Sequence, residues 1–548
     1  MSIGLRRHTI TTLVIIVISM SAHSQPITIG GIVRDTVTLY PLDSVRVEIV
    51  NTSNPLERYT VYTNGAGRWS YTFQSSGVGE SGGLPQSIML HQNYPNPFNP
   101  STILTFRLHK AGLVRISVHG ILGQVLDERS LMLAPGGYSV RWSSKGAAGV
   151  LFYTLESDGV RLTKKMLQLD GGDGDGLGDV TLTQGVAPLP SSGQPDLVDY
   201  TITVSKLGYE PDSVTVPLVN NNNVDFRLQT VHRRAFVIDL HNDVLELVVG
   251  GYQLGVRHTT NHSDLPRFRD GGVDAQMLSL WPSPTQFPNT AYERVLQMAD
   301  SFSVQLARNP TTLAHTRTVA EIEQAVAAGK FAGILAVEGG HAIQEDLNKL
   351  VTFYQRGVRY MTITWNNSTS WATAAADPQA ETRGLSDFGR QVIRTMDSLG
   401  IIIDVSHVGR RTILDILQVT TKPIVASHSG VRALRDHYRN LTDDQIISIA
   451  QRGGVIGVVF YPTFLSPTNT ATIDTVIRHI DYIKNLVGID YVALGSDFDG
   501  INTTPVGLED VSRFPNLTMA LLRHGYTPAE VRKLLGENYM RVFRAVCR

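Results

Sequence analysis

The pattern of apolar and polar positions changes once along the chain, near Arg234. Before this point, short segments alternate apolar and polar residues, as in Val45-Arg46-Val47-Glu48-Ile49, which is typical of half-buried β-strands. After it, short apolar runs alternate with longer helical stretches, which predicts strands and helices in turn. We therefore expect all-β domains followed by an α/β domain.

The second part of the chain contains eight apolar segments that predict strands. They cover residues 235–241, 275–281, 331–337, 358–364, 401–406, 423–427, 454–460 and 491–496. Helical stretches lie between them, such as residues 292–307, 319–328, 385–399 and 411–417. Eight strands with interposed helices over residues 234–548 match a (β/α)8 TIM-like barrel, in which the chemistry takes place at the C-terminal ends of the strands.

Side chains that can bind metal follow these predicted strand ends. His241 and Asp243 end the first strand, and residues two apart in a strand point the same way. Glu338 ends the third strand, His407 the fifth and His428 the sixth. Each alone has a structural explanation, such as a hydrogen-bonded core histidine. Five such residues at four strand ends instead predict a two-metal hydrolytic site, because imidazoles and a shared carboxylate suit zinc or a similar divalent ion.

Residues 234–548 resemble the membrane (renal-type) dipeptidases, peptidase family M19, which are metallopeptidases with an amidohydrolase-like barrel. The matching motifs occur in the family's order and spacing. They are Asp239-Leu240-His241-Asn242-Asp243, Asp264-Leu265-Pro266-Arg267, Glu338-Gly339-Gly340-His341, Asp404-Val405-Ser406-His407, Ser427-His428-Ser429, Arg439-Asn440-Leu441-Thr442 and Gly495-Ser496-Asp497-Phe498-Asp499-Gly500.

The resemblance implies which residues bind the metal. His241 and Asp243 would bind one Zn²⁺, and His407 and His428 would bind a second. Glu338 would bridge the two ions and so belong to the catalytic residues as well as to the metal ligands. The resemblance thus implies two zinc ions per chain.

The resemblance also implies how the substrate is held and where a proton goes. Arg439 would bind the C-terminal carboxylate of the substrate, for which a guanidinium fork is well shaped. Asp497 would be the catalytic proton shuttle between the attacking water and the leaving amine. Asp499 is the alternative, because the sequence does not decide which of the two carboxylates points inward.

One position departs from the family pattern. Mammalian members have a His where Trp365 stands, and that His is thought to polarise the scissile carbonyl. An indole can donate one hydrogen bond but cannot become cationic. Either Asn366 or the metals take over this task, or the preferred substrate differs, and Trp365 could equally be a pocket wall. We expect both Trp365 and Asn366 to bind substrate.

The first 24 residues have the pattern of a secretory signal peptide. Arg6 and Arg7 precede an apolar run over residues 13–18, and Ala22-His23-Ser24 offers small residues for cleavage before Gln25. The apolar run is shorter than the ~20 residues that a membrane span needs. We therefore expect an exported protein that is periplasmic, at the cell surface or secreted.

Composition narrows the classes of partner. Lys and Arg number 48 against 49 for Asp and Glu, so the net charge of −1 provides no basic field for nucleic acid. Cys547 is the only cysteine, which excludes an internal disulfide.

The all-β part resembles two known modules, one inserted in the other. Residues 25–78 and 198–229 are similar to the β-sandwich found in regulatory-type carboxypeptidases, on Thr63-Asn64-Gly65-Ala66-Gly67-Arg68-Trp69-Ser70-Tyr71 and a later strand pair with a Gly-Tyr turn. Residues 84–169 resemble the immunoglobulin-like sorting domain of Bacteroidetes-type secretion tails, on Asn93-Tyr94-Pro95-Asn96-Pro97-Phe98-Asn99-Pro100. This insertion is either a sorting domain or a structural β-module.

Residues 170–197 predict a linker between these modules. The run from Asp170 to Gly176 alternates Gly and Asp, but it lacks the Glu at position twelve that an EF-hand loop requires. Pro and Ser follow it. We expect a flexible, solvated linker in place of a calcium site.

These observations predict an exported dinuclear-zinc dipeptidase that hydrolyses the peptide bond of dipeptides by attack of a metal-bound hydroxide. Two alternatives remain open: a related amidohydrolase acting on a lactam, lactone or N-acyl amino acid, and an inactive surface binding protein. The expected partner is a small dipeptide, with no nucleic acid and no membrane span. A homodimer is left open, as is association with the cell surface or the secretion machinery through the N-terminal β-domains.

Overall fold

The computed structural model describes residues 27–73, 88–93, 96, 98, 100–108, 110–185, 199–219 and 222–547. The predicted signal peptide, residues 1–24, lies outside this range. The chain forms two compact units, one within residues 74–197 and the other from residues 27–73 and 198–548. In the part of the chain that the structure describes, no helix has the length and apolar character needed to cross a bilayer.

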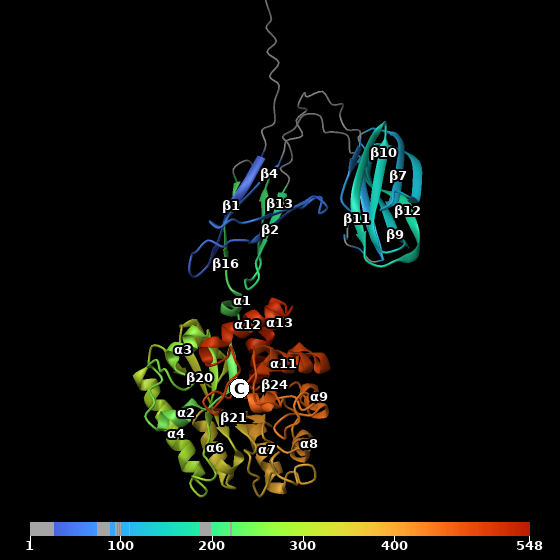
Figure 1. The fold of residues 1–548 in the computed structure, drawn as a ribbon. Helices are drawn as coiled ribbons and strands as arrows, with labels where there is room; N and C mark the ends of the chain where they lie inside the picture. The colour runs from blue at the N-terminus through green and yellow to red at the C-terminus, as the bar shows by residue number, and fades with distance from the viewer. Residues whose placement is uncertain are drawn as a thin grey trace, which may run out of the picture. The chain divides into compact units, whose positions relative to one another are not determined.

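The largest part of the second unit is the predicted (β/α)8 barrel. All eight strands are present and pair in parallel in chain order, which confirms the fold class (Figure 1). They are β17 (Ile238–Asn242), β18 (Ala275–Leu280), β20 (Phe331–Glu338), β21 (Val358–Thr362), β22 (Ile402–Asp404), β23 (Val425–Ser429), β24 (Val455–Val458) and β25 (Val492–Leu494). A short extra strand, β19 (Leu313–His315), pairs with β20.

Helices surround this sheet (Figure 1). They are α2 (Val244–Val249), α3 (Leu265–Asp270), α4 (Ala291–Arg308), α5 (Val319–Ala327), α6 (Leu347–Gln355), α7 (Asp387–Leu399), α8 (Arg410–Val419), α9 (Asp443–Gln451), α10 (Pro462–Leu465), α11 (Ile473–Val487), α12 (Phe514–Arg523), α13 (Pro528–Arg532) and α14 (Asn538–Val546), with the short α1 (Val231–Arg234) before β17.

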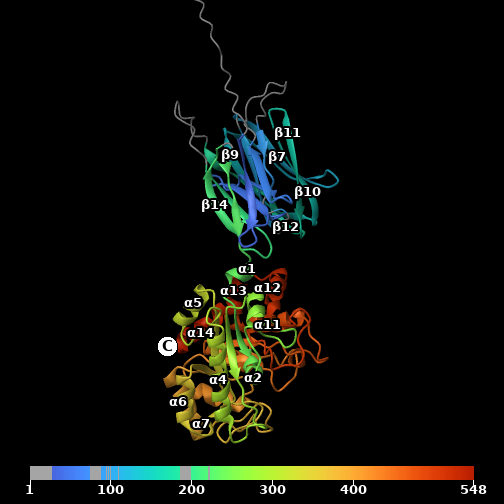
Figure 2. The ribbon, with the colours of Figure 1, turned by 90° about the vertical axis from the view of Figure 1, so that its left-hand side faces the viewer.

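Helix α7 shows how local sequence places a helix on the sheet. Ser386 caps its first turn by accepting from the Gly389 amide, and Gly400 ends it with a φ of +82°. Val392 and Met396 lie one turn apart and are buried against the barrel. The C-terminal helix α14 lies beside α5, and Tyr539 and Phe543 of α14 pack against alternate strand residues in a second apolar cluster (Figure 2).

Side-chain hydrogen bonds close the barrel between β17 and β25. The carboxylate of Asp239 accepts from the amide of Ser496 at 2.7 Å and from its hydroxyl at 2.6 Å. The amide of Asp497 donates to the carbonyl of His241 at 3.1 Å. The ends of the first and last strands, with their candidate site residues, are therefore held together.

A second buried carboxylate joins three strands near the site. β22 and β23 share one register pair, between Asp404 and Val425. The carboxylate of Asp404 accepts from the Ser427 amide at 2.8 Å, from the Ser427 hydroxyl at 2.7 Å and from the Thr362 hydroxyl at 2.5 Å. It thereby fixes the ends of β21, β22 and β23 where regular ladder bonds are few.

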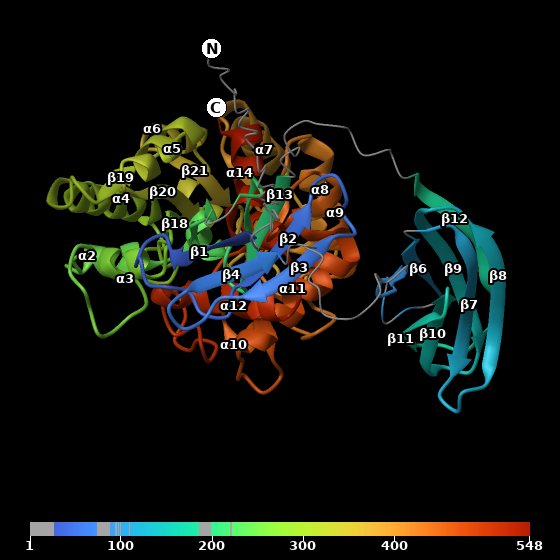
Figure 3. The same cartoon turned by 90° about the horizontal axis from the view of Figure 1, so that it is seen from above.

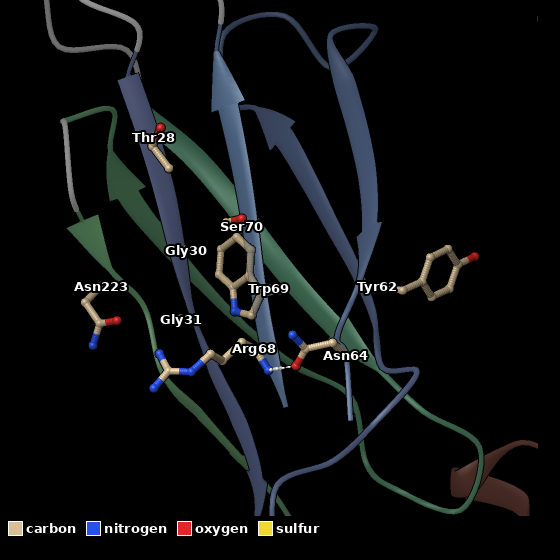
Figure 4. A pocket seen from close by; sticks show the side chains of 9 residues that line it. All are labelled: Thr28, Gly30, Gly31, Tyr62, Asn64, Arg68, Trp69, Ser70 and Asn223. Carbon is tan, nitrogen blue, oxygen red and sulfur yellow. Dashed lines mark hydrogen bonds between the residues drawn. The ribbon is translucent and has the colours of Figure 1, made fainter. Parts of the chain in front are cut away.

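The sandwich contains strands from both sides of the insertion. One sheet has the order β14-β13-β2-β3, and in the other β1 pairs with β4, β15 and β16. These are β1 (Ile27–Asp35), β2 (Arg46–Asn51), β3 (Arg58–Tyr62), β4 (Arg68–Phe73), β13 (Asp199–Ser205), β14 (Asp212–Pro217), β15 (Asn222–Asn223) and β16 (Phe226–Leu228). A hollow of about 610 Å³ lies over β1 and β4, beside Arg68, Trp69 and Ser70 (Figure 4). Its described lining includes no His, Cys, Asp or Glu side chain.

The insertion is a separate sandwich with sheets β11-β10-β7-β8 and β12-β9-β6-β5 (Figure 3). Its strands are β5 (Ile88–Leu90), β6 (Ser101–Leu108), β7 (Gly112–Gly120), β8 (Val125–Leu133), β9 (Gly136–Gly146), β10 (Gly149–Ser157), β11 (Val160–Gln168) and β12 (Gly172–Gly185). Trp142 and Tyr153 are fully buried in its core.

The predicted linker over residues 170–197 was wrong in its first half. Residues 172–185 form β12, which pairs antiparallel with β9 through several register shifts. Ladder bonds use backbone groups, so a Gly- and Asp-rich segment can form them when its irregularities are accommodated. Leu177 of β12 is buried in the core of this sandwich, and its amide donates to the Asp127 carboxylate at 2.9 Å.

Candidate metal centre

The ends of the barrel strands bring six side chains with metal-ligating atoms together. They fall into three overlapping groups in which the ligand atoms lie within 4.8 Å of one another. Within the described residues the groups are His241, Asp243 and Glu338; Glu338, His407 and His428; and His241, His428 and Asp497. All five predicted metal ligands are therefore adjacent in the fold, although 187 positions separate the first from the last in the sequence (428 − 241).

Glu338 lies between the histidines. Its Oε2 is 3.4 Å from His241 Nε2, whereas its Oε1 is 3.0 Å from His407 Nε2 and 3.6 Å from His428 Nε2. Asp243 Oδ2 lies 3.3 Å from His241 Nε2. A carboxylate whose two oxygens face different imidazoles has the arrangement needed to bridge two cations.

Hydrogen bonds fix the tautomers of two of these histidines. The Oδ1 of Asn366 lies 2.9 Å from His407 Nδ1, and because this oxygen only accepts, His407 Nδ1 carries the hydrogen. The hydroxyl of Tyr360 donates to the Leu240 carbonyl at 3.0 Å and so accepts from His241 Nδ1 at 2.7 Å. In their neutral forms both imidazoles therefore carry the hydrogen on Nδ1 and direct Nε2 to the space beside Glu338.

The third histidine follows the same rule. Ser427 donates its hydroxyl hydrogen to Asp404 at 2.7 Å, so it accepts from His428 Nδ1 at 2.8 Å. The Nε2 atoms of His428 and His407 then face each other at 3.0 Å without a hydrogen between them. Lone pairs this close repel unless a cation lies between or beside them, and buried polar atoms are normally paired. The residues present therefore fit bound metal.

Burial and neighbouring charges set the protonation of the cluster. Burial, with the Arg439 guanidinium nearby, lowers the pKa of His407 to about 3, and burial beside His241 holds the pKa of His428 well below its usual range. Burial also acts to lower the pKa of His241, but the surrounding hydroxyl and carboxylates outweigh it and raise that pKa. The imidazoles hold the pKa of Glu338 well below its usual range despite burial. Glu338 is thus ionised, and a cation at His241 Nε2 would replace a proton.

Arg439 is a buried cation beside this cluster. It is 3 % exposed, and its Nη2 donates to the His428 carbonyl at 3.1 Å. Its Nε and Nη1 have no hydrogen-bond partner among the described residues. Buried donors without partners are costly, so this guanidinium is prepared to bind an anion.

The structure distinguishes the two candidate proton shuttles. Asp497 belongs to the group with His241 and His428, and burial raises its pKa well above the usual range. Asp499 Oδ1 instead accepts from the His262 amide at 2.7 Å, and its own amide donates to His262 Nδ1 at 2.9 Å. Asp499 therefore fixes a loop, and Asp497 is the carboxylate that faces the cluster.

The two predicted substrate-binding residues after β21 have different surroundings. The ring of Trp365 lies 6.1 Å from that of His407, between centroids, and 5.1 Å from that of Trp281. Asn366 uses its side-chain oxygen on His407, which leaves only its amide NH₂ for a substrate. Sequence reasoning missed this positioning contact and missed Trp281, although its place at the C-terminal end of the predicted strand 275–281 was a usable signal.

Comparison with known proteins agrees with this geometry. The model of the membrane dipeptidases, peptidase family M19, matches residues 226–548. A solved dipeptidase, AC, of the same family is 29% identical over 57% of this chain and 99% of its own, with a TM-score of 0.54. A metallopeptidase from Rhodobacter sphaeroides, liganded with a phosphinate mimic of the dipeptide L-Ala-D-Ala, is 28% identical over 57% and 99%, with a TM-score of 0.53. An amidohydrolase from Pseudomonas aeruginosa is 26% identical over 58% and 98%, with a TM-score of 0.51.

The family match covers more than half of the chain and includes every strand end that contributes to the cluster. It confirms the predicted resemblance and the predicted enzyme class. The chain therefore belongs to the membrane dipeptidases, peptidase family M19, and is a metallo-dipeptidase.

Proposed function

We propose that this metallo-dipeptidase cleaves dipeptides with two zinc ions, one held by His241 and Asp243, the other by His407 and His428, and both by Glu338. The observation that supports this is the approach of three imidazole Nε2 atoms to the two oxygens of buried Glu338. Imidazole nitrogen and carboxylate oxygen are typical zinc ligands. The phosphinate dipeptide mimic bound to the Rhodobacter metallopeptidase supports a dipeptide substrate.

Zinc bound there would supply positive charge that acidifies water and polarises the peptide carbonyl. The residues of the chain supply the remaining steps. Arg439 binds the C-terminal carboxylate of the dipeptide through its unpaired Nε and Nη1. Asp497 accepts a proton from the attacking water and donates it to the leaving amine nitrogen. Backbone φ values of +64° at Asp497 and +66° at His407 are unusual for these residues and indicate that the fold holds both in place.

Metal removal tests the proposed stoichiometry. Treatment with a strong chelator such as dipicolinate should reduce dipeptide hydrolysis to background while the protein stays folded. Activity should return on titration with Zn²⁺ and reach its plateau at two equivalents per chain, with a rise in the unfolding temperature because the ions bind the native state. Elemental analysis and calorimetry measure the number of zinc ions bound per chain. A plateau at one equivalent, or full activity in metal-free protein, would contradict the dinuclear site.

Replacing Asn366 with Ala tests the orientation of His407. Loss of the contact at His407 Nδ1 should weaken binding of the second zinc by about 10- to 100-fold, since the partners of ligating histidines set their tautomer and direction. Competition with a chromophoric chelator measures the affinity. Asn367→Ala is the matched control, because the side-chain oxygen of Asn367 is unpartnered in the described chain. Equal affinities in the two variants would remove Asn366 from this role.

A further inference from the structure

Two indole rings lie on one side of the metal cluster. Trp281 directly follows β18 and Trp365 follows β21, and in the sheet these strands flank β20, which ends at Glu338. The ring centroids are 5.1 Å apart, with 52° between the planes. Both residues are half-buried and not fully enclosed. Together Trp281 and Trp365 form what we call the indole wall.

The loop after Glu338 holds this wall in place. Burial lowers the pKa of His341, and the neutral ring donates from Nε2 to the carbonyl of Pro282, next to Trp281, at 2.8 Å. Gly339 has a φ of +101°, and a Cβ there would lie 2.5 Å from the His341 ring and 3.4 Å from the Cβ of Trp365. The positive φ and the close approach of the His341 ring thus require a glycine at this turn, and Trp365 packs beside it.

The carboxylate-binding group lies on the opposite side of the barrel. Arg439 bonds to the end of β23, and Asp497 follows β25, whereas the indole wall belongs to β18 and β21. A dipeptide has its C-terminal carboxylate at one end and its N-terminal residue at the other. With the carboxylate on Arg439 and the scissile carbonyl beside Glu338, the N-terminal residue extends toward the indole wall.

We propose that the indole wall binds the N-terminal side chain of the dipeptide and selects large apolar residues, aromatic ones above all. This inference rests on the orientation given under the proposed function. An indole offers a wide apolar face and a single donor, so it gains from covering an apolar or aromatic side chain and gains little from glycine. The departure from the family pattern at Trp365 is then a change in substrate preference.

Two series of dipeptides test the proposal on the zinc-loaded enzyme. In the series X-Ala, with X as Gly, Ala, Leu or Phe, the kcat/KM of Phe-Ala should exceed that of Gly-Ala by about 10- to 100-fold. In the series Ala-X, the kcat/KM should vary less with X. Trp281→Ala and Trp365→Ala should each reduce the Phe-to-Gly ratio, that is, the kcat/KM of Phe-Ala divided by that of Gly-Ala, about 10-fold. The main cause should be a lower kcat/KM for Phe-Ala. Trp365→Phe, which retains a flat apolar ring, should keep most of the preference.

The ratio is measured on one preparation, so it does not depend on how much of a variant is folded. Tyr438→Ala is the control for the Phe-to-Gly ratio and should leave it unchanged. Tyr438 is also aromatic, but it is 44 % exposed and lies on the β23 side, away from the indole wall. A flat X-Ala series in the wild type would overturn the proposal, as would an equal loss of Gly-Ala and Phe-Ala hydrolysis in the variants. Selectivity confined to Ala-X would also overturn it, by reversing the orientation. Failure to cleave any dipeptide would instead count against the proposed function.

Discussion

Replacing Glu338 with Gln is expected to remove the proposed zinc pair and to lower kcat/KM for dipeptides by at least about 1,000-fold. Glu338 is 4 % exposed and is the carboxylate that two of the ligand groups share. Glutamine has the same shape but only one acceptor oxygen, and its NH₂ would face an imidazole Nε2 in place of a carboxylate oxygen. The loss of negative charge also leaves the cations without their shared ligand.

Zinc content by elemental analysis and kcat/KM at saturating Zn²⁺ measure the effect. Glu246→Gln is the matched control. Helix α2 begins directly after Asp243, and Glu246 lies in its first turn, yet Glu246 belongs to none of the three ligand groups. That variant should retain both ions and most of the activity. Two zinc ions per chain in the Glu338 variant, or turnover within 10-fold of the wild type, would contradict the bridging assignment.

The sequence predicted the barrel and its ligand positions because both follow from local patterns. Each strand is a short apolar run, and in a parallel barrel the C-terminal ends meet at one face whatever the distance between them in the chain. His241, Glu338, His407 and His428 could therefore be placed together without knowing any contact. Arg439 and Asp497 were placed beside them by the family resemblance and not by the strand pattern.

The sequence could not predict contacts between residues that are distant in the chain, because no periodic pattern of apolar residues indicates such contacts. Asn366 and Asp499 carry the same kinds of atom as a substrate ligand or a proton shuttle, and only the fold shows that they bond to His407 and His262. The side-chain bonds of Asp239 and Asp404 that close the barrel are of this kind. Strand β12 was missed for a related reason, because its pairing with β9 uses backbone groups that Gly and Asp also possess.

Replacing Arg439 with Met is expected to lower kcat/KM for dipeptides by on the order of 100- to 1,000-fold while both proposed zinc ions stay bound. Arg439 lies beside the ligands but is not one of them, and its Nε and Nη1 are buried cationic donors without a hydrogen-bond partner among the described residues. Methionine has a similar length and fills the space, so the main loss is the charge-assisted hydrogen bonds to the substrate carboxylate. This outcome separates a substrate-binding residue from a metal ligand.

Comparison of each dipeptide with its C-terminal amide isolates that contact. The wild type should prefer the free carboxylate strongly, whereas the Met variant should hydrolyse the dipeptide and its amide at similar kcat/KM, because neither substrate then has a partner for its C-terminus. Arg435→Met is the matched control, because Arg435 lies in the same loop and donates to the Thr463 and Asp436 carbonyls. This variant should keep the preference for the free carboxylate. If the preference for the carboxylate survived in the Arg439 variant, the carboxylate would have to bind elsewhere, and the direction in which the dipeptide lies across the barrel would be reversed.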